Sequence, residues 1–509
     1  MRRFFREEVY IALALLAAIL LGVFVVDDYG ISWDEPQIYN YGEYALNAYR
    51  YFFHPQDLTG YVYNHLNFYG PVHFMIARAL SRPIMHLNST WSVGTANHFI
   101  YYLTFIFSVL ALYLLSRRWM TKLAALGSTL LFATQPLMFG HAFINPKDMP
   151  FMAFFLGSIY FGLRIFDDLP KVSWQKVLLA GIVLGLTTSI RVIAPMAGAL
   201  VLIYGSIKSP HKAIKVAPFY AVITIVVMYL TWPYLWNAPL PNFFASISMM
   251  SDFPFEGGAT LFMGTMYPID HLPLRYIPGL LVMQLTVPAL ILIGIGIPVS
   301  FWSFRKERKW EPLLLFTGWF LAPTLWLILS RSALYDNARQ LLFLWPPLFI
   351  IAGIGLDKLL VIKRTYLWKT TLLILILLPG VYACFRLHPY EYIYYNSLTG
   401  GVQGASRQYE LDYWGTSFKE ATEYINQNAD QGTQVVVTGP RTLSRLYARP
   451  DIAIIGPARL EKKNVDYYYS LCLTRNNDDL EQPLCRQGEL VYEVERLGGV
   501  LAYIKKHTP

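Results

Sequence analysis

The chain has 509 residues, of which 55% are hydrophobic and only 15% are charged, too apolar a composition for a soluble protein of this length. The net charge of +9 does not indicate a nucleic-acid partner, because the basic residues lie in short loops between apolar runs and form no surface stripe with interleaved aromatic residues. We therefore expect a polytopic α-helical membrane protein that contacts membrane lipid and no nucleic acid.

The first apolar run covers residues 9–26 and is long enough to cross a bilayer, since about 20 helical residues span the hydrocarbon layer. The basic residues Arg2, Arg3 and Arg6 before it would also suit a signal peptide. The run is long for a signal peptide, however, and no small-residue cleavage site follows it. We interpret it as a retained membrane anchor.

The following apolar runs are separated by short polar pieces. They cover residues 97–115, 123–140, 149–166, 177–207, 213–236, 277–303, 311–330, 341–356 and 370–386. The run 177–207 is too long for one span and has basic residues at both ends, which predicts a tight hairpin with Arg191 near its apex. About eleven spans result.

Basic loops predict the orientation of these spans, because Lys and Arg in short loops favour the cytoplasmic side. Such loops lie at 117–122, 305–309 and 357–369, whereas acidic residues collect in the alternate loops. We therefore expect a cytoplasmic N-terminus, an external loop at 27–96, and an external C-terminus in an inner (plasma) membrane.

The external loop 27–96 contains a predicted helix at 36–53 that is rich in Tyr and Phe. Aromatic side chains favour the headgroup level of a bilayer, so this helix is expected to lie along the membrane surface. Packing of the same side chains against neighbouring spans explains the pattern equally well.

The tail 387–509 is more polar than residues 1–386 and is predicted to be a small external soluble α/β domain. Short β-type runs lie at 434–437, 452–455, 465–469 and 499–504, and a helix is expected at 417–427. Cys472 and Cys485 both lie in this domain, and one pair of external cysteines fits either a disulfide or two free thiols.

Several ionisable residues fall at the external ends of predicted spans. Because charges near membrane depth are costly, such positions are functional candidates by default. They are Asp34, Glu35, Lys147, Asp148, Arg191, Arg331 and Arg339. Their common side of the membrane predicts an external active site.

The motifs around these residues resemble a known family. Asp34 and Glu35 soon after the first span, the aromatic segment 68–73, and the motifs at 143–150 and 335–342 are similar to those of protein O-mannosyltransferases and bacterial aminoarabinose transferases. These enzymes are GT-C membrane glycosyltransferases, and the resemblance covers most of residues 1–390. It implies a GT-C fold and a polyprenyl-phosphate-linked sugar as donor. The tail motif at 388–396 departs from the classical protein mannosyltransferases, so the acceptor, protein or glycan, is not implied.

The resemblance implies roles for the three acidic residues. Asp34 matches the catalytic Asp of the family, Glu35 the Glu beside it, and Asp148 an acidic residue that faces the same cavity. A carboxylate suits this chemistry, because an acceptor hydroxyl needs a base to take its proton. Helix initiation explains the same residues, since Asp34 and Glu35 precede Pro36 and Asp148 precedes Pro150 by two residues.

The leaving group of such a reaction is a lipid phosphate, which needs fixed cationic donors. Arg339 is the first candidate because it matches the basic residue of the family before a late helix, and Arg331, Lys147 and Arg191 are further candidates. Snorkelling to the membrane surface explains Arg331 and Lys147 as well, and an internal salt bridge explains Arg191.

No histidine spacing predicts a metal site, and the resemblance is to a metal-independent branch, although some GT-C enzymes use a divalent cation. We expect an inverting glycosyltransferase that moves a hexosyl or pentosyl group to an acceptor hydroxyl on the outer membrane face. A lipid transporter or flippase would share the spans, but the chain lacks the duplicated halves that are common in transporters. A ligase that moves a preassembled glycan would share the fold.

Overall fold

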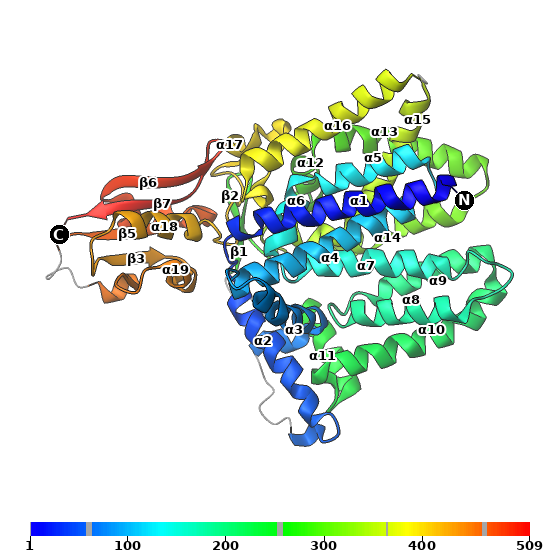
Figure 1. Ribbon diagram of the computed structural model, residues 1–509, viewed down its shortest axis with the longest axis horizontal. Helices are drawn as coiled ribbons and strands as arrows, with labels where there is room; N and C mark the ends of the chain where they lie inside the picture. The colour runs from blue at the N-terminus through cyan, green and yellow to red at the C-terminus, as the bar shows by residue number, and fades with distance from the viewer. Residues whose placement is uncertain (1, 58–63, 252–257, 363–364, 461–465, 509) are drawn as a thin grey trace.

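The computed structural model describes residues 2–57, 64–251, 258–362, 365–460 and 466–508. Long helices run side by side through most of the molecule, and a small domain with a β-sheet lies at the end opposite the N-terminus (Figure 1). The predicted polytopic helical fold with a small C-terminal α/β domain is confirmed.

Each predicted span falls on a helix. The helices are α1 Arg2–Val25, α4 Val93–Ser116, α5 Lys122–Ala133 with α6 Pro136–Ile144, α7 Asp148–Arg164, α8 Trp174–Thr188, α9 Pro195–Lys208, α10 Pro210–Thr231, α13 Val287–Lys306, α14 Trp310–Leu329, α15 Pro346–Ile362 and α16 Tyr366–Leu387. Within the described ranges, six helices are long and apolar enough to cross a membrane alone, and α5 with α6, bent by 60°, would form a seventh span. The shorter apolar helices α8 and α9, together with α7 and α15, occupy the remaining four predicted positions.

The run predicted as one span at 277–303 is divided into the short helix α12 Tyr276–Gln284 and the long helix α13. The side chain of Gln135 stabilises the break, because its amide nitrogen donates to the Gln284 carbonyl at 2.7 Å and its oxygen accepts from the Thr286 N–H at 3.1 Å. The span therefore begins at Val287. The predicted hairpin does form, with Arg191 in the turn between α8 and α9.

The loop after α1 carries α2 Glu35–Ala48 and α3 Val72–Leu87, which pack together at the end of the bundle nearer the sheet domain (Figure 1). The predicted helix at 36–53 thus ends at Ala48 and continues only as a short 3₁₀ turn, Tyr49–Tyr51. Glu43 on α2 joins the two helices by ion pairs with Arg78 at 2.8 Å and Arg82 at 2.5 Å. The later loop, between α10 and α12, holds α11 Pro239–Ser251 and the hairpin β1 Ala259–Phe262 and β2 Thr265–Pro268.

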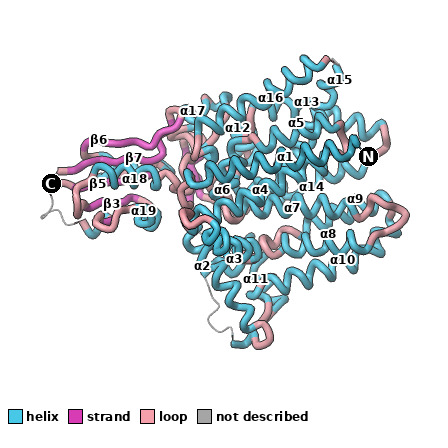
Figure 2. Tube along the Cα trace, viewed as in Figure 1, coloured by secondary structure: helices cyan, strands magenta, loops and turns pink. Residues whose placement is uncertain are grey.

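The C-terminal domain is built on a five-stranded sheet (Figure 2). Its elements are α17 Gly401–Ala405, α18 Phe418–Asn428, β3 Gln434–Thr438, α19 Arg441–Tyr447, β4 Ala453–Ile455, β5 Tyr468–Leu473, α20 Pro483–Arg486, β6 Glu489–Arg496 and β7 Gly499–His507. The strand order is β4-β3-β5-β7-β6, with β3 parallel to both β4 and β5, and β7 antiparallel to β5 and β6. The strand predicted at 465–469 begins later, at Tyr468, and Val465 lies outside the described residues.

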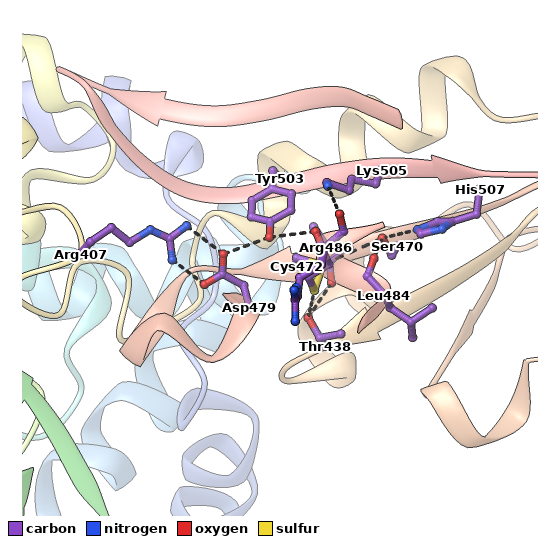
Figure 3. Close-up of a disulfide and its surroundings, with 12 residues drawn as sticks. Arg407, Thr438, Ser470, Cys472, Asp479, Leu484, Arg486, Tyr503, Lys505 and His507 are labelled. Carbon is purple, nitrogen blue, oxygen red and sulfur yellow. Dashed lines mark hydrogen bonds and ion pairs between the residues drawn. A yellow bond between two sulfur atoms is a disulfide. The ribbon is translucent and has the colours of Figure 1, made fainter. Parts of the chain in front are cut away.

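A disulfide joins Cys472 on β5 to Cys485 on α20, which decides the open question of these two cysteines (Figure 3). Beside it, Arg407 pairs with Asp479 at 2.5 Å, and the Tyr503 hydroxyl donates to the same carboxylate at 3.0 Å. Arg407 follows α17 and precedes the strands of the sheet, so these bonds hold the β5–α20 region to the segment that leads out of the bundle.

Residues 388–416 pack deeply against the helices. The Tyr395 hydroxyl donates to the Asn337 side chain at 2.8 Å, and the Asn396 amide donates to the Leu285 carbonyl at 2.8 Å. Both Tyr395 and Asn396 are buried. The domain boundary at 387 remains a prediction, because this segment belongs to the bundle by its contacts and to the tail by its composition.

Candidate active site

Asp34 and Lys147 form an ion pair at the end of the bundle that faces the sheet domain. Asp34 lies directly before α2 and Lys147 directly before α7, and Lys147 Nζ is 2.5 Å from Asp34 Oδ2. The side chain of Asp34 is 38% exposed to solvent, whereas that of Lys147 is 9% exposed. Lys147 also lies 5.5 Å from the centre of the Tyr69 ring. The Asp34 carboxylate is thus accessible from one side and neutralised from the other.

The pKa of Asp34 follows from these surroundings. Burial by the surrounding protein would raise the pKa of Asp34, but the charges of Lys147 and Arg339 outweigh it and hold the pKa below its ordinary value. Burial likewise would lower the pKa of Lys147, and the Asp34 charge raises it instead. Both groups are therefore charged at neutral pH.

The position of Lys147 is fixed by Asn145. The Asn145 side-chain oxygen accepts hydrogen bonds from the N–H groups of Lys147 at 3.1 Å and Asp148 at 2.8 Å, as a capping side chain does at a helix start. Its amide nitrogen lies 3.2 Å from both Asp148 Oδ2 and His141 Nδ1. One buried asparagine therefore orients both the lysine and the aspartate of the motif.

Asp148 joins two arginines. Its carboxylate pairs with Arg191 from the α8–α9 turn and with Arg339 Nη1 at 3.2 Å. Arg339 also pairs with Asp336 at 2.8 Å. Elements far apart in the sequence thus converge on one charged cluster, which we define as Asp34, Lys147, Asp148, Arg191, Asp336 and Arg339.

Arg339 is the most enclosed member of the cluster, at 2% exposure. Its guanidinium lies 4.8 Å from the ring centres of both Tyr335 and Trp414. Burial would lower the pKa of Arg339, but the carboxylates of Asp336 and Asp148, with Tyr335, raise it well above the ordinary value. This arginine is permanently charged and firmly held.

A cavity of about 280 Å³ opens beside the cluster. Its walls are mostly apolar and aromatic, and Arg191 is its one cationic lining group among the described residues. Representative lining residues are Tyr69, Phe151, Arg191, Trp326, Tyr335 and Phe343. The Arg191 Nε atom is buried and has no hydrogen-bond partner among the described residues. The cavity therefore combines an apolar wall with one partly exposed cation.

Two predicted site residues lie apart from the cluster. Glu35 is fully buried and accepts hydrogen bonds from the Ser32 N–H at 2.6 Å and the Tyr39 hydroxyl at 2.8 Å, with His98 Nε2 at 3.1 Å. These contacts organise the start of α2, as a capping carboxylate does. Arg331 is exposed and lines a separate small pocket together with Asp270.

The network extends further than the sequence analysis predicted. Asp336 also pairs with Arg475 of the C-terminal domain at 2.6 Å, and Arg475 lies 3.7 Å from the buried Glu410. Asp336 stands in the motif at 335–342 and could have been singled out there. Arg475 follows β5 in a region without a recognisable motif, and only the fold brings it to Asp336.

Among the described residues, no group of three or more His, Cys, Asp or Glu side chains could hold a metal ion. The carboxylates of the cluster face lysine and arginine instead.

Comparison with known proteins adds the family context. Residues 74–236 match the family model of dolichyl-phosphate-mannose-protein mannosyltransferases. No curated protein matches the chain. Among solved structures, ArnT from Cupriavidus metallidurans in the apo state shares 13% identity with a TM-score of 0.50, covering 99% of this chain and 98% of that one. The chain has the GT-C membrane glycosyltransferase fold.

Two further GT-C structures are similar over most of the chain. ArnT bound to undecaprenyl phosphate has 13% identity and a TM-score of 0.49, with 98% of each chain covered. The oligosaccharyltransferase AglB from Archaeoglobus fulgidus, in complex with an inhibitory peptide and a dolichol-phosphate, has 13% identity and a TM-score of 0.46, covering 91% of this chain and 69% of that one. The predicted GT-C fold is confirmed by the likeness to apo ArnT; the roles of individual residues stay predictions.

Proposed function

We propose that the protein is an inverting glycosyltransferase that moves a sugar from a polyprenyl-phosphate carrier to an acceptor hydroxyl on the outer face of the membrane. One observation carries the proposal: a half-accessible carboxylate, Asp34, pairs with Lys147 in a cluster that holds two further cations, and an apolar cavity opens against one of them, Arg191. A carboxylate for the acceptor and cations for a phosphate are the two groups that this transfer requires.

In this reaction the acceptor oxygen attacks the anomeric carbon, and the bond from that carbon to the phosphate oxygen breaks on the opposite face. The acceptor proton passes to Asp34, and the electron pair of the broken bond stays on the lipid phosphate. Because Lys147 holds Asp34 ionised, the carboxylate is ready to accept a proton at neutral pH. A single displacement of this kind inverts the anomeric configuration.

The carrier phosphate binds next to Arg191 and Lys147 in this account. Arg191 lines the cavity and its side chain is 17% exposed, which suits an incoming phosphate oxygen. Arg339 pairs with two carboxylates, Asp148 and Asp336, whereas Arg191 pairs with Asp148 alone, so we assign Arg339 a positioning role behind Arg191. The aromatic wall of the cavity fits the first isoprene units of the carrier.

We assign the charged cluster to the external side. The loop charges predict that the C-terminal domain lies outside, and the cluster lies at the end of the bundle that carries this domain (Figure 1). We place the protein in the inner (plasma) membrane with this end outward and the N-terminus in the cytoplasm.

The test uses the purified full-length protein in nanodiscs with a panel of polyprenyl-phosphate sugars, hexosyl and pentosyl. Mass spectrometry follows the loss of sugar from each carrier, and an added acceptor mixture reports transfer. We expect at least one carrier to lose its sugar, with a transferred product of inverted configuration. No loss from any carrier, together with carrier translocation in proteoliposomes, would instead identify a flippase.

A further inference from the structure

A second and larger cavity, of about 850 Å³, lies where the sheet domain meets the bundle. The residues that follow β3, β4 and β5 form one side of it, including Gly439, Gly456 and Arg475. These three strands are parallel, with β3 in the centre. The carboxyl ends of parallel strands commonly form ligand crevices, because the loops on either side diverge there. We call this cavity the sheet-end crevice.

The crevice has polar walls with groups that remain available to a ligand. Arg441 and Arg459 are exposed and have no carboxylate partner among the described residues. A side chain at Gly456 would collide with the Arg441 guanidinium at 2.6 Å, so this glycine lets the guanidinium lie against the end of β4. The buried side-chain oxygen of Asn476 has no hydrogen-bond partner among the described residues, and it offers an acceptor.

The crevice reaches the candidate active site through Trp33. This residue lines the crevice, keeps 38% exposure, and directly precedes Asp34 in the chain. Arg475 lies 5.6 Å from the centre of its ring. Arg475 pairs with Asp336, Asp336 with Arg339, and Arg339 with Asp148, which pairs with Arg191. A continuous chain of ion pairs therefore runs from the crevice to the wall of the smaller cavity.

We propose that the sheet-end crevice binds the acceptor and that this acceptor is a glycan with an acidic substituent, such as a carboxylate or a phosphate. The inference rests on the proposed function. Trp33 offers an aromatic face to a sugar ring. Asn476 and Asp478 accept hydrogen bonds from the sugar hydroxyls, and Arg441 and Arg459 bind the acidic substituent. A glycan held here presents its end to Asp34.

A peptide acceptor fits the crevice less well. Extended peptides commonly bind by adding a strand to an exposed sheet edge. The sheet-end crevice opens at the ends of β3, β4 and β5, and both edges of the central strand β3 are already paired. Its lining includes arginine, asparagine, aspartate and tryptophan side chains, and this mixture suits a polyhydroxylated ligand.

The test measures binding by calorimetry with the full-length protein in nanodiscs and three probes: trigalacturonate, the neutral maltotriose, and a hexaglutamate peptide. We expect trigalacturonate to bind most tightly. The double variant Arg441→Ala/Arg459→Ala should weaken its binding by roughly tenfold or more, since each charge-assisted hydrogen bond contributes more than a neutral one. Trp33→Ala should weaken the binding of both saccharides.

Arg486→Ala is the matched control, because Arg486 is an exposed arginine of the same domain outside the crevice, and it should bind like the wild type. Tighter binding of hexaglutamate would overturn the glycan assignment in favour of a peptide. No binding of either saccharide, or binding that the double variant leaves unchanged, would remove the crevice as the glycan site. Carrier sugar release is measured separately, so its absence would refute the proposed function even where glycan binding persists.

Discussion

At the scale of single residues, the pairing of Asp34 with Lys147 is the feature that most affects the chemistry. The cation keeps the carboxylate ionised despite the burial around it. The Asp34–Glu35 dipeptide and the Lys147–Asp148 dipeptide were both predicted as site residues, but their pairing was not. It depends on the approach of the residue before α2 to the residue before α7, which no local pattern in the sequence encodes.

We expect removal of the Lys147 charge to change the pH dependence of the transfer reaction. In the wild type, the acid limb of kcat/KM that reports Asp34 should lie below its ordinary pKa of about 3.9, because Lys147 and Arg339 lower that pKa. Lys147→Met leaves the burial and removes the nearer charge, so the limb should move to higher pH. A pH–rate profile of both proteins decides it, and an unmoved limb would show that Lys147 does not control Asp34.

The two arginines of Asp148 should differ when they are replaced. Arg339→Ala removes one of the two arginine partners of both Asp148 and Asp336, so we expect a clear fall in unfolding temperature together with lost activity. Arg191→Ala, at the cavity wall, should raise the KM for the carrier with a smaller loss of stability. Arg339→Lys should recover only part of the loss, because the planar fork is absent.

Thermal unfolding and donor kinetics of the three variants separate these roles. A stable Arg339→Ala protein with a raised carrier KM would place Arg339 on the phosphate instead.

At the scale of elements, the apolar runs predicted the spans because hydrophobic length is a local property of the chain. The division of 277–303 into α12 and α13 was not predicted, since the break is held by Gln135, which lies between α5 and α6. Strand β6 was also missed, because its charged and exposed residues do not alternate as those of a half-buried strand do. The contact that holds the first break comes from a distant part of the chain, whereas β6 pairs with the adjacent strand β7 and was missed for its composition.

The start of α7 predicts a role for Asn145. Asn145→Ala removes the acceptor for two N–H groups, which typically costs about 1 kcal/mol, and it frees Lys147 and Asp148 to move. Asn145→Asp keeps the acceptor oxygen but loses the amide N–H groups. We expect it to be more active than the alanine variant. The measurement is kcat with the unfolding temperature of each variant. Equal activity of the alanine variant and the wild type would show that this turn does not position the site.

At the scale of the whole molecule, the C-terminal domain and the candidate active site lie at one end of the bundle, and the N-terminus lies at the other (Figure 1). The sequence predicted both the helical bundle and the α/β tail. It could not predict that Arg475 of the tail completes the ion pairs of the bundle, because only the packing of the two parts brings Arg475 to Asp336.

Cysteine labelling of intact cells tests the orientation of the molecule. Gln431→Cys, at an exposed position of the C-terminal domain, should react with an impermeant maleimide in intact cells. Lys306→Cys, exposed at the far end of α13, should react only after permeabilisation. The reverse pattern would place the active site in the cytoplasm.

The central claim is that Asp34 takes the proton of the acceptor. The most direct measurement is the transfer rate of Asp34→Asn at saturating carrier, with carrier binding and unfolding temperature measured on the same sample. Asparagine keeps the size of the side chain but accepts no proton, so we predict a rate lower by about 10²–10⁴-fold with carrier binding and folding retained. A rate within a few-fold of the wild type, in a folded protein that binds the carrier, would contradict the account.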